Sequence, residues 1–298
     1  MIFLKINGSS LRVLYLYKRG ELLMNQRKPL KELNLLDKFL FDEAMDDPEN
    51  VKTMLDIILS QNTKLKHPPQ TEKEQRTSTD NRQIRLDVYA IDEDDVIYEV
   101  EAQKENTHNL PKRSRLYQGI IDSKLLPPGV TDFNLLNEVL IVMITPFDLF
   151  GYGLYRYTFQ MRCEEVPELK LDDGATRIFL NTRGKHPELV SPELIELLKY
   201  MEHSTDEISE TCKSKRIQEM HRRICQVKAS EKTEVKYMQA WEEKLLIKQE
   251  GIAEGKQIGV EQINKLNQRL IEQGRFEDLT KAASDKVYQE KLLKEFGI

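Results

Sequence analysis

The chain of 298 residues has little cysteine and no long apolar run. Its three cysteines, Cys163, Cys212 and Cys225, are odd in number, and their spacings fit neither a disulfide framework nor a zinc site. We therefore expect free thiols in a reducing cytosol, and hence a cytoplasmic protein. No apolar stretch approaches the roughly 18 residues that a membrane helix needs, so no membrane partner is expected.

An excess of positive charge is also missing. Lysine and arginine total 45 against 50 acidic residues, a net charge of -5. This balance excludes proteins that hold nucleic acid through bulk positive charge. The sequence contains no Walker loop and no dinucleotide-binding glycine motif, which argues against ATP or NAD as cofactors. The five histidines show no ligand spacing such as H-x-x-x-H, and we expect them on the surface or in loops.

The first 23 residues differ in character from the rest of the chain. Lys5 and Arg12 interrupt their apolar residues, and they are not followed by a small-residue cleavage site, so they do not form a secretory signal. A second methionine, Met24, is followed by a short polar segment. Residues 18–21, just before it, can be encoded by a purine-rich stretch like a bacterial ribosome-binding site. One interpretation is that translation starts at Met24 and that 1–23 is a mis-assigned or disordered extension. The alternative is a genuine extra strand or helix.

Local patterns predict an α/β fold: a mixed central sheet flanked by helices, with a charged helical tail at the C-terminus. Helices are predicted over 33–45, over 48–60 after an Asp47-Pro48 cap, and from Pro111 to about 126. Residues 61–80 are polar and are predicted to be a loop. Strands are predicted as a hairpin over 84–103 and over 138–146, 152–162 and 175–181. After residue 191 the chain is expected to be helical, with a hinge at the glycines of 250–260.

The predicted hairpin gathers acidic side chains on one face. Alternation along the second strand places Glu99, Glu101 and Gln103 on the same side. If the turn centres on Asp94, Asp87 lies opposite Glu101, with Cβ atoms about 4.5–5.5 Å apart. Such a pair requires a cation, and carboxylate oxygens suit Mg²⁺, with Mn²⁺ as an alternative. The competing interpretation is a hairpin whose acids face water, like the acidic turn 92–95.

Several segments in order carry a resemblance to a known family. The sequence resembles the recombination-promoting nuclease and transposase-like family of the PD-(D/E)XK nuclease superfamily. The resemblance extends from about residue 33 to the end and includes the tail pattern EGxxEG. It rests on these segments: LLDKFLFDEAMDDPENVKTMLDIIL, RLDVYAIDEDDVIYEVEAQ, LPKRSRLYQGIIDSKLLPPG, VLIVMITPFDLFG and DGATRIFLNTRG.

The resemblance implies a restriction-endonuclease-like core and metal-dependent cleavage of DNA. Asp87 takes the place of the first metal-binding acid, Glu101 that of the second, and the carbonyl of Ala102 completes the metal set. Gln103 stands where the superfamily pattern has lysine, as in the E-x-Q form of the narrower family, and Leu86 replaces the superfamily's proline. A neutral glutamine can orient a water or phosphate only through hydrogen bonds.

Three further residues are candidates for accessory roles. Glu99, on the face of Glu101, and Lys104 nearby are possible helpers of the metal site. Glu43, on the first amphipathic helix, takes the place of an extra acid that some superfamily members carry there. The alternative for Glu43 is an ordinary solvated helix residue.

The segment 104–124 carries five basic and two acidic residues, a local excess that the whole-chain sum conceals. Its helix bears Lys112, Arg113, Arg115 and Tyr117. A basic helix beside a metal site suits contacts to phosphate, which are insensitive to base sequence and sensitive to salt. The alternative is an ordinary exposed amphipathic helix.

These observations predict a nuclease-like domain over 24–190 and a charged helical region over 191–298. The function expected is a Mg²⁺-dependent DNA endonuclease. A second hypothesis is a non-catalytic DNA-binding or assembly protein on the same fold, motivated by the glutamine at position 103. A third treats the tail as primary: a helical protein with a vestigial head that binds a partner or forms homo-oligomers through its C-terminal helices.

Overall fold

The computed structural model describes residues 27–75 and 84–298. The segment 1–23 and the alternative start at Met24 lie outside the described residues. The chain divides into two compact units, one ending at Glu234 and one beginning at Val235. Among the described residues, no helix is both long and apolar enough to cross a bilayer.

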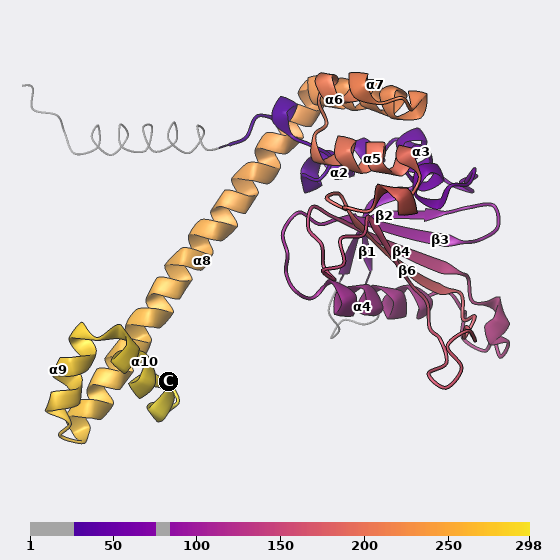
Figure 1. Cartoon of the computed structure of the whole chain (residues 1–298). Helices are drawn as coiled ribbons and strands as arrows, with labels where there is room; N and C mark the ends of the chain where they lie inside the picture. The colour runs from indigo at the N-terminus through magenta and orange to yellow at the C-terminus, as the bar shows by residue number, and fades with distance from the viewer. Residues whose placement is uncertain (1–26, 76–83) are drawn as a thin grey trace, which may run out of the picture. The chain divides into compact units, whose positions relative to one another are not determined.

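A six-stranded mixed sheet forms the centre of the first unit, which confirms the predicted α/β class. Its strands lie in the order β1-β2-β3-β4-β6-β5 (Figure 1). β1, β2 and β3 are antiparallel neighbours, β3, β4 and β6 run parallel, and β5 is an antiparallel edge strand. The bounds are β1 Gln70–Gln75, β2 Ile84–Ile91, β3 Ile97–Ala102, β4 Val139–Thr145, β5 Arg156–Phe159 and β6 Ala175–Asn181.

The β2–β3 hairpin adopts the register expected from a turn centred on Asp94. Val88 pairs with Val100 and Tyr89 with Glu99. Continuing this register by one residue brings Asp87 opposite Glu101. Cross-strand partners project to the same face of a sheet, so the two carboxylates are neighbours.

The turn of this hairpin is organised by Asp92. Its carboxylate accepts hydrogen bonds from the backbone N–H groups of Asp94 (3.0 Å) and Val96 (2.9 Å) and from the hydroxyl of Tyr98 (2.6 Å). Asp92 is buried, so the expectation that residues 92–95 form only a solvated turn was wrong for this residue. A side chain bonded to its own turn fixes the chain reversal and thereby the pairing of the strands.

Helices cover both faces of the sheet. α4 (Leu110–Asp122) lies on one face, and α2 (Lys38–Met45), α3 (Pro48–Leu59) and α5 (Pro192–Glu202) lie on the other (Figure 1). α6 (Asp206–Thr211) and α7 (Lys215–Ala229) form a further layer that contacts α5. Short 3₁₀ turns occupy Leu30–Glu32, Phe133–Leu135 and Pro187–Leu189.

The cap predicted at the start of α3 is present. The carboxylate of Asp47 accepts a hydrogen bond from the N–H of Glu49 (2.9 Å), and Pro48 is the first helical residue. This cap satisfies one of the free N–H groups of the first turn. Proline, which has no backbone N–H, is tolerated as the first helical residue because an N–H at that position would have no intrahelical partner.

Some predicted elements differ from those observed. The segment predicted as a loop over 61–80 contains β1, whose residues are all polar, which suits an edge strand and leaves no apolar alternation to detect. The expected hinge at 250–260 lies inside α8 (Glu231–Glu272), which runs through its glycines without a break. A glycine costs only about 1 kcal/mol in a helix, and no proline interrupts the segment. β5 is shorter than the predicted strand, and α4 ends earlier than predicted.

The second unit is entirely helical. α9 (Phe276–Ser284) and α10 (Lys286–Phe296) come after the end of α8. Leu266 and Leu270 of α8 pack with Ala282 and Leu292 in a small apolar core. Helices α5, α6 and α7, which the sequence grouped with the tail, belong to the first unit because α5 and α7 contact α3.

Candidate functional site

Three carboxylates are buried on the sheet face that α4 covers. Asp87 is 4% exposed, Glu99 0% and Glu101 6%. Strand alternation puts them on the face of Ile141 and Met143, which pack with α4 in the apolar core. A buried carboxylate is unfavourable unless a cation or hydrogen-bond donors surround it, so this cluster is the most strongly constrained polar feature of the sheet.

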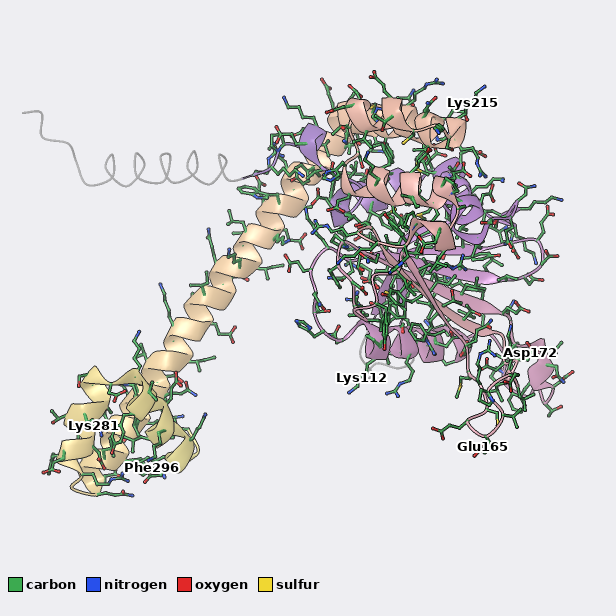
Figure 2. All side chains as sticks on the ribbon, viewed as in Figure 1. Lys112, Glu165, Asp172, Lys215, Lys281 and Phe296 are labelled. Atoms are coloured by element: carbon green, nitrogen blue, oxygen red, sulfur yellow. The ribbon has the colours of Figure 1, made fainter. Side chains whose placement is uncertain are left out.

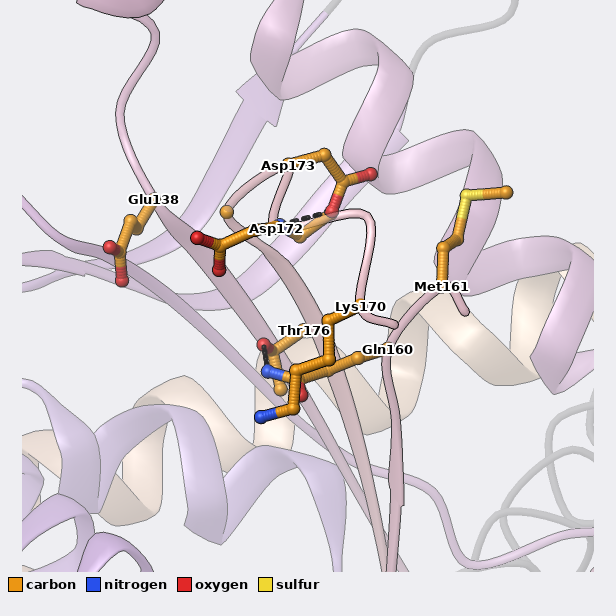
Figure 3. A pocket seen from close by; sticks show the side chains of 9 residues that line it. Glu138, Gln160, Met161, Lys170, Asp172, Asp173 and Thr176 are labelled. Carbon is orange, nitrogen blue, oxygen red and sulfur yellow. Dashed lines mark hydrogen bonds between the residues drawn. The ribbon is translucent and has the colours of Figure 1, made fainter. Parts of the chain in front are cut away.

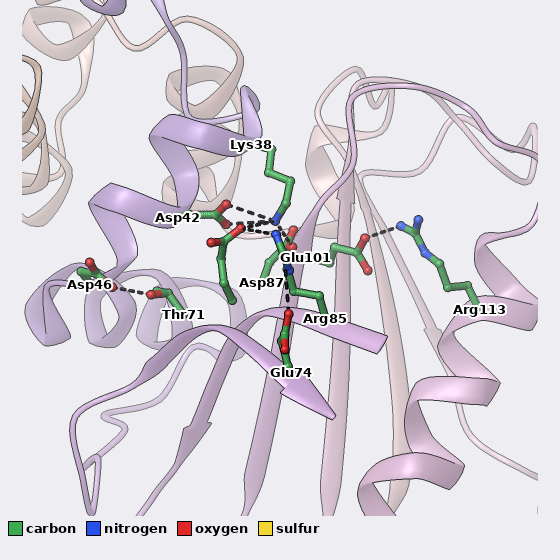
Figure 4. Close-up of polar contacts among 10 residues, drawn as sticks. Lys38, Asp42, Asp46, Thr71, Glu74, Arg85, Asp87, Glu101 and Arg113 are labelled. Carbon is green, nitrogen blue, oxygen red and sulfur yellow. Dashed lines mark hydrogen bonds and ion pairs between the residues drawn. The ribbon is translucent and has the colours of Figure 1, made fainter. Parts of the chain in front are cut away.

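Two basic side chains reach the cluster from different helices (Figure 4). Lys38, the first residue of α2, forms an ion pair with Asp87 and a second with Asp42 at 3.1 Å. Arg113 of α4 pairs with Glu101 and also donates to the amide oxygen of Gln103 at 2.8 Å. Each helix is therefore held to the hairpin by a charged contact.

The sequence did not identify Lys38, Asp42 or Glu72 as members of this cluster. Lys38 also lies 3.9 Å from the carboxylate of Glu72 on β1. The β1–β2 register places Glu72 across from Asp87. Since β1 was predicted to be a loop, no sequence pattern could place Glu72 there. Asp42 and Lys38 are one helical turn apart on α2, a spacing that signals an ion pair but not its location.

Burial changes the ionisation of these acids. It raises the pKa of Glu101 to about 7, with a further increase from the charge of Asp87 and an opposing effect from Arg113. Burial likewise raises the pKa of Asp42 to about 8, against the nearby ammonium of Lys38. Burial and the charge of Glu101 raise the pKa of Glu99 well above its ordinary value. Burial also raises the pKa of Asp87, although Lys38 opposes the shift.

The donor set of the cluster fits a hard divalent cation. Both carboxylate oxygens of Glu99 and Oε2 of Glu101 are buried without a hydrogen-bond partner. Carboxylate oxygens are the ligands that Mg²⁺ prefers. By their chemistry Asp87, Glu101 and Glu99 are the side chains that would hold it, although the oxygens of all three do not converge on one point in the described residues as the ligand atoms of Asp206, His221 and Cys225 do. The backbone N–H of Ala102 donates to the Asp87 carboxylate and lowers its pKa, while the role expected for the Ala102 carbonyl stays a prediction.

Gln103, Lys104 and Glu43 have different environments. The amide nitrogen of Gln103 donates to the carbonyl of Glu105 at 2.7 Å, so its oxygen points toward Arg113. Lys104 forms an ion pair with Asp37, the residue before α2, rather than with the buried carboxylates. Glu43 is half-buried on α2. Its neighbour Asp42 is the α2 carboxylate that contacts Lys38.

The basic residues of α4 lie in two environments, some exposed to solvent and one turned toward the carboxylates. Lys112 and Arg115 are exposed, and Lys112 projects from α4 away from the sheet (Figure 2). Arg113 turns inward to Glu101. Tyr117 is only 7% exposed and packs in the apolar core, so it is placed to support α4 and not to contact DNA.

A surface hollow lies at the other end of the central parallel strands from the carboxylates (Figure 3). It adjoins the start of β4 and β6, whereas Glu101 stands near the end of β3. Because β3, β4 and β6 are parallel, the hollow lies where these strands begin, and the carboxylates lie toward the end of β3. Its lining includes Glu138, Gln160, Lys170, Asp172, Asp173 and Thr176.

Comparison of the chain with protein-family models, with curated proteins and with solved structures finds no match.

The raised pKa of Glu101 predicts a pH-dependent stability. The folded state binds this proton more tightly than the unfolded state, so the free energy of unfolding falls as pH rises from about 4.5 through about 7. At about 1.4 kcal/mol per pKa unit, the loss is roughly 3 kcal/mol. Glu101→Gln is expected to remove this contribution, while the raised pKa of Asp42 leaves a pH dependence of its own. Urea denaturation across this pH range measures the effect.

The exposed Glu105 supplies a matched control. Glu105→Gln removes one charge close to the site in sequence but no buried carboxylate. We expect its stability to vary with pH as that of the wild-type chain does. If the free energy of unfolding changes with pH in the same way for wild type and Glu101→Gln, the assignment of Glu101 as a destabilised buried acid is contradicted.

Proposed function

We propose that the chain is a Mg²⁺-dependent DNA endonuclease, with Mn²⁺ as an alternative cofactor. The observation that carries this proposal is the burial of Asp87, Glu99 and Glu101 together, with three carboxylate oxygens lacking partners. The resemblance of the hairpin segment to the PD-(D/E)XK superfamily supports the same chemistry. The free thiols of Cys163, Cys212 and Cys225 agree with a cytoplasmic location, where DNA is present.

The proposed mechanism assigns a separate role to each side chain. Mg²⁺, when bound by the carboxylates, supplies stabilisation of phosphate charge and a lower pKa for a water nucleophile. Lys38 and Arg113, which pair with Asp87 and Glu101, are the basic side chains that would contact a phosphate bound beside these acids. Gln103, aligned by Arg113 and by Glu105, orients a water or phosphate oxygen through its amide.

Lys38 can compensate for the missing lysine at position 103. Its ammonium contacts Asp87 from α2, and burial lowers its pKa less than Asp87 and Asp42 raise it. The side chain therefore stays charged. A fixed positive charge beside the reacting phosphate stabilises the developing negative charge, which glutamine cannot do.

Removal of the metal-binding acids tests the catalytic proposal. We expect Asp87→Asn, Glu101→Gln and the double variant Asp87→Ala/Glu101→Ala to lower Mg²⁺- or Mn²⁺-dependent plasmid nicking by roughly a hundredfold or more, because the charge that holds the cation is removed. Titration calorimetry with Mg²⁺ should show the same weakening of binding.

Asp94→Asn is the matched control, since Asp94 is an exposed acid of the same hairpin. It should retain both nicking and Mg²⁺ binding. Equal nicking by wild type and the double alanine variant would refute the catalytic role of the two acids.

The exposed basic residues of α4 favour a second candidate, a DNA-binding protein without catalysis. In this case Lys112 and Arg115 contact phosphate, and DNA retention depends on salt but not on metal. Lys112→Gln/Arg115→Gln should lower the slope of log affinity against log salt by about 0.9 for each phosphate that the protein no longer neutralises. Fluorescence anisotropy at several salt concentrations measures this slope.

Lys213→Gln/Lys215→Gln removes two exposed charges from the helical layer on the other side of the sheet (Figure 2). This control should leave the slope unchanged. If both double variants reduce the slope equally, DNA binding is not specific to α4. Metal-independent retention without any nicking would favour this candidate over the endonuclease.

Apolar side chains on α8 favour self-association as an additional property. Leu246, Ile247, Ile252 and Val260 are all exposed. Packing such positions against a second copy would bury them from water. We expect Leu246→Gln/Ile247→Gln to shift the full chain toward monomer in sedimentation velocity. The neighbouring Lys244→Gln/Lys248→Gln should not change the sedimentation profile. An unchanged profile for Leu246→Gln/Ile247→Gln would count against association through α8.

A further inference from the structure

A second cluster of ligating side chains lies in the layer formed by α6 and α7. Asp206 is the first residue of α6, and His221 and Cys225 are on α7. The four-residue spacing of His221 and Cys225 puts them one above the other on one face of the helix. None of the three belongs to the carboxylate cluster of the hairpin.

The three potential ligand atoms surround one point. Oδ1 of Asp206 lies 2.8 Å from Nε2 of His221, and Sγ of Cys225 lies 3.4 Å from the same nitrogen. Sγ and Oδ1 are 3.9 Å apart. A point about 2.0 Å from all three atoms exists within this triangle, and zinc bonds are about 2.0–2.3 Å long. Coordination also requires the imidazole to rotate so that Nε2 points at this centre, because Sγ now lies over the ring.

The arrangement differs from a nucleophilic triad. In a triad, the nucleophile and the carboxylate use different nitrogens of the histidine ring. Here the Asp206 carboxylate meets Nε2 and the hydroxyl of Tyr200 meets Nδ1 at 2.9 Å, while Sγ of Cys225 lies over the ring, 3.4 Å from Nε2 and 3.9 Å from Nδ1. The thiol is therefore not paired with a second ring nitrogen as a triad nucleophile is.

Tyr200 fixes the orientation of the imidazole. It is fully buried on α5, and its ring meets that of His221 edge-on at 5.5 Å. Metal-bound histidines usually donate their second N–H to such an outer partner, which sets the tautomer. With a metal on Nε2, the proton moves to Nδ1 and is donated to the tyrosine oxygen.

We propose that Asp206, His221 and Cys225 form a binding site for Zn²⁺ or a similar borderline-soft divalent ion. A thiolate, an imidazole and a carboxylate suit zinc, whereas the all-oxygen cluster on the hairpin suits Mg²⁺. The Asp206 side chain is 86% exposed, so solvent reaches the fourth coordination position.

Binding is coupled to release of a proton. Burial and the charge of Asp206 raise the pKa of the Cys225 thiol, with an opposing effect from Lys228. The Lys228 ammonium donates to the carbonyl of Ser204 at 2.8 Å, which holds it by its own hydrogen bond. A thiol binds zinc as thiolate, so its proton is lost to solvent when the ion binds.

The site links the start of α6 to α7 in the layer above α5. A bound ion would join two helices that now meet through hydrogen bonds alone at this point. Because an ion that binds only the folded state stabilises that state, zinc should raise the melting temperature of the full chain. This readout does not depend on nuclease activity.

Cobalt titration of the full chain tests the site directly. In the Asp87→Asn/Glu101→Gln background, which removes the hairpin ligands, the chelator-treated protein should bind one Co²⁺ per chain. Binding should produce a thiolate-to-cobalt charge-transfer band and the intense visible bands of four-coordinate cobalt. Zn²⁺ should displace Co²⁺ and raise the melting temperature, whereas Mg²⁺ should do neither.

Two variants and one control identify the ligands. Cys225→Ser should abolish the charge-transfer band, and Asp206→Asn, which alters only an exposed side chain, should weaken Co²⁺ affinity at least tenfold. Cys163→Ser removes another free thiol and should change nothing. The proposal is overturned if the unmodified site gives no charge-transfer band, or if Asp206→Asn binds Co²⁺ as tightly as the parent.

Discussion

The burial of three carboxylates on one sheet face constrains the rest of the first unit. Asp87, Glu99 and Glu101 would be strongly destabilising there if they stood alone. Lys38 and Arg113 offset their charge from opposite helices. The same ion pairs fix how α2 and α4 sit against the hairpin. Glu99 has no hydrogen-bond partner for either oxygen, and burial raises its pKa, which favours its neutral form.

The chain carries two candidate metal centres of different chemistry. The hairpin cluster offers oxygen ligands in a buried setting and is next to an exposed basic helix. The α6–α7 cluster offers oxygen, nitrogen and sulfur near solvent. Hard and borderline-soft ions are separated by such donor sets and not by affinity alone.

The sequence predicted the hairpin and its facing acids because both result from local rules. A period of two places side chains on faces, and a turn centred on Asp94 sets the register. The prediction failed for β1, because its residues are all polar and resemble a loop until β2 pairs with them. It failed at the glycines of α8 because the propensity of a few residues does not decide the state of a long helix.

The sequence by itself determined the α/β class, the α3 cap and the pairing of Asp87 with Glu101. Each depends on residues that are close along the chain. Only the tertiary structure decided that Lys38 neutralises Asp87, that Tyr117 is internal, and that Asp206 meets His221 and Cys225. The spacing of the cysteines and histidines had argued against a zinc site. Contacts between distant segments are set by packing, which no local periodicity encodes.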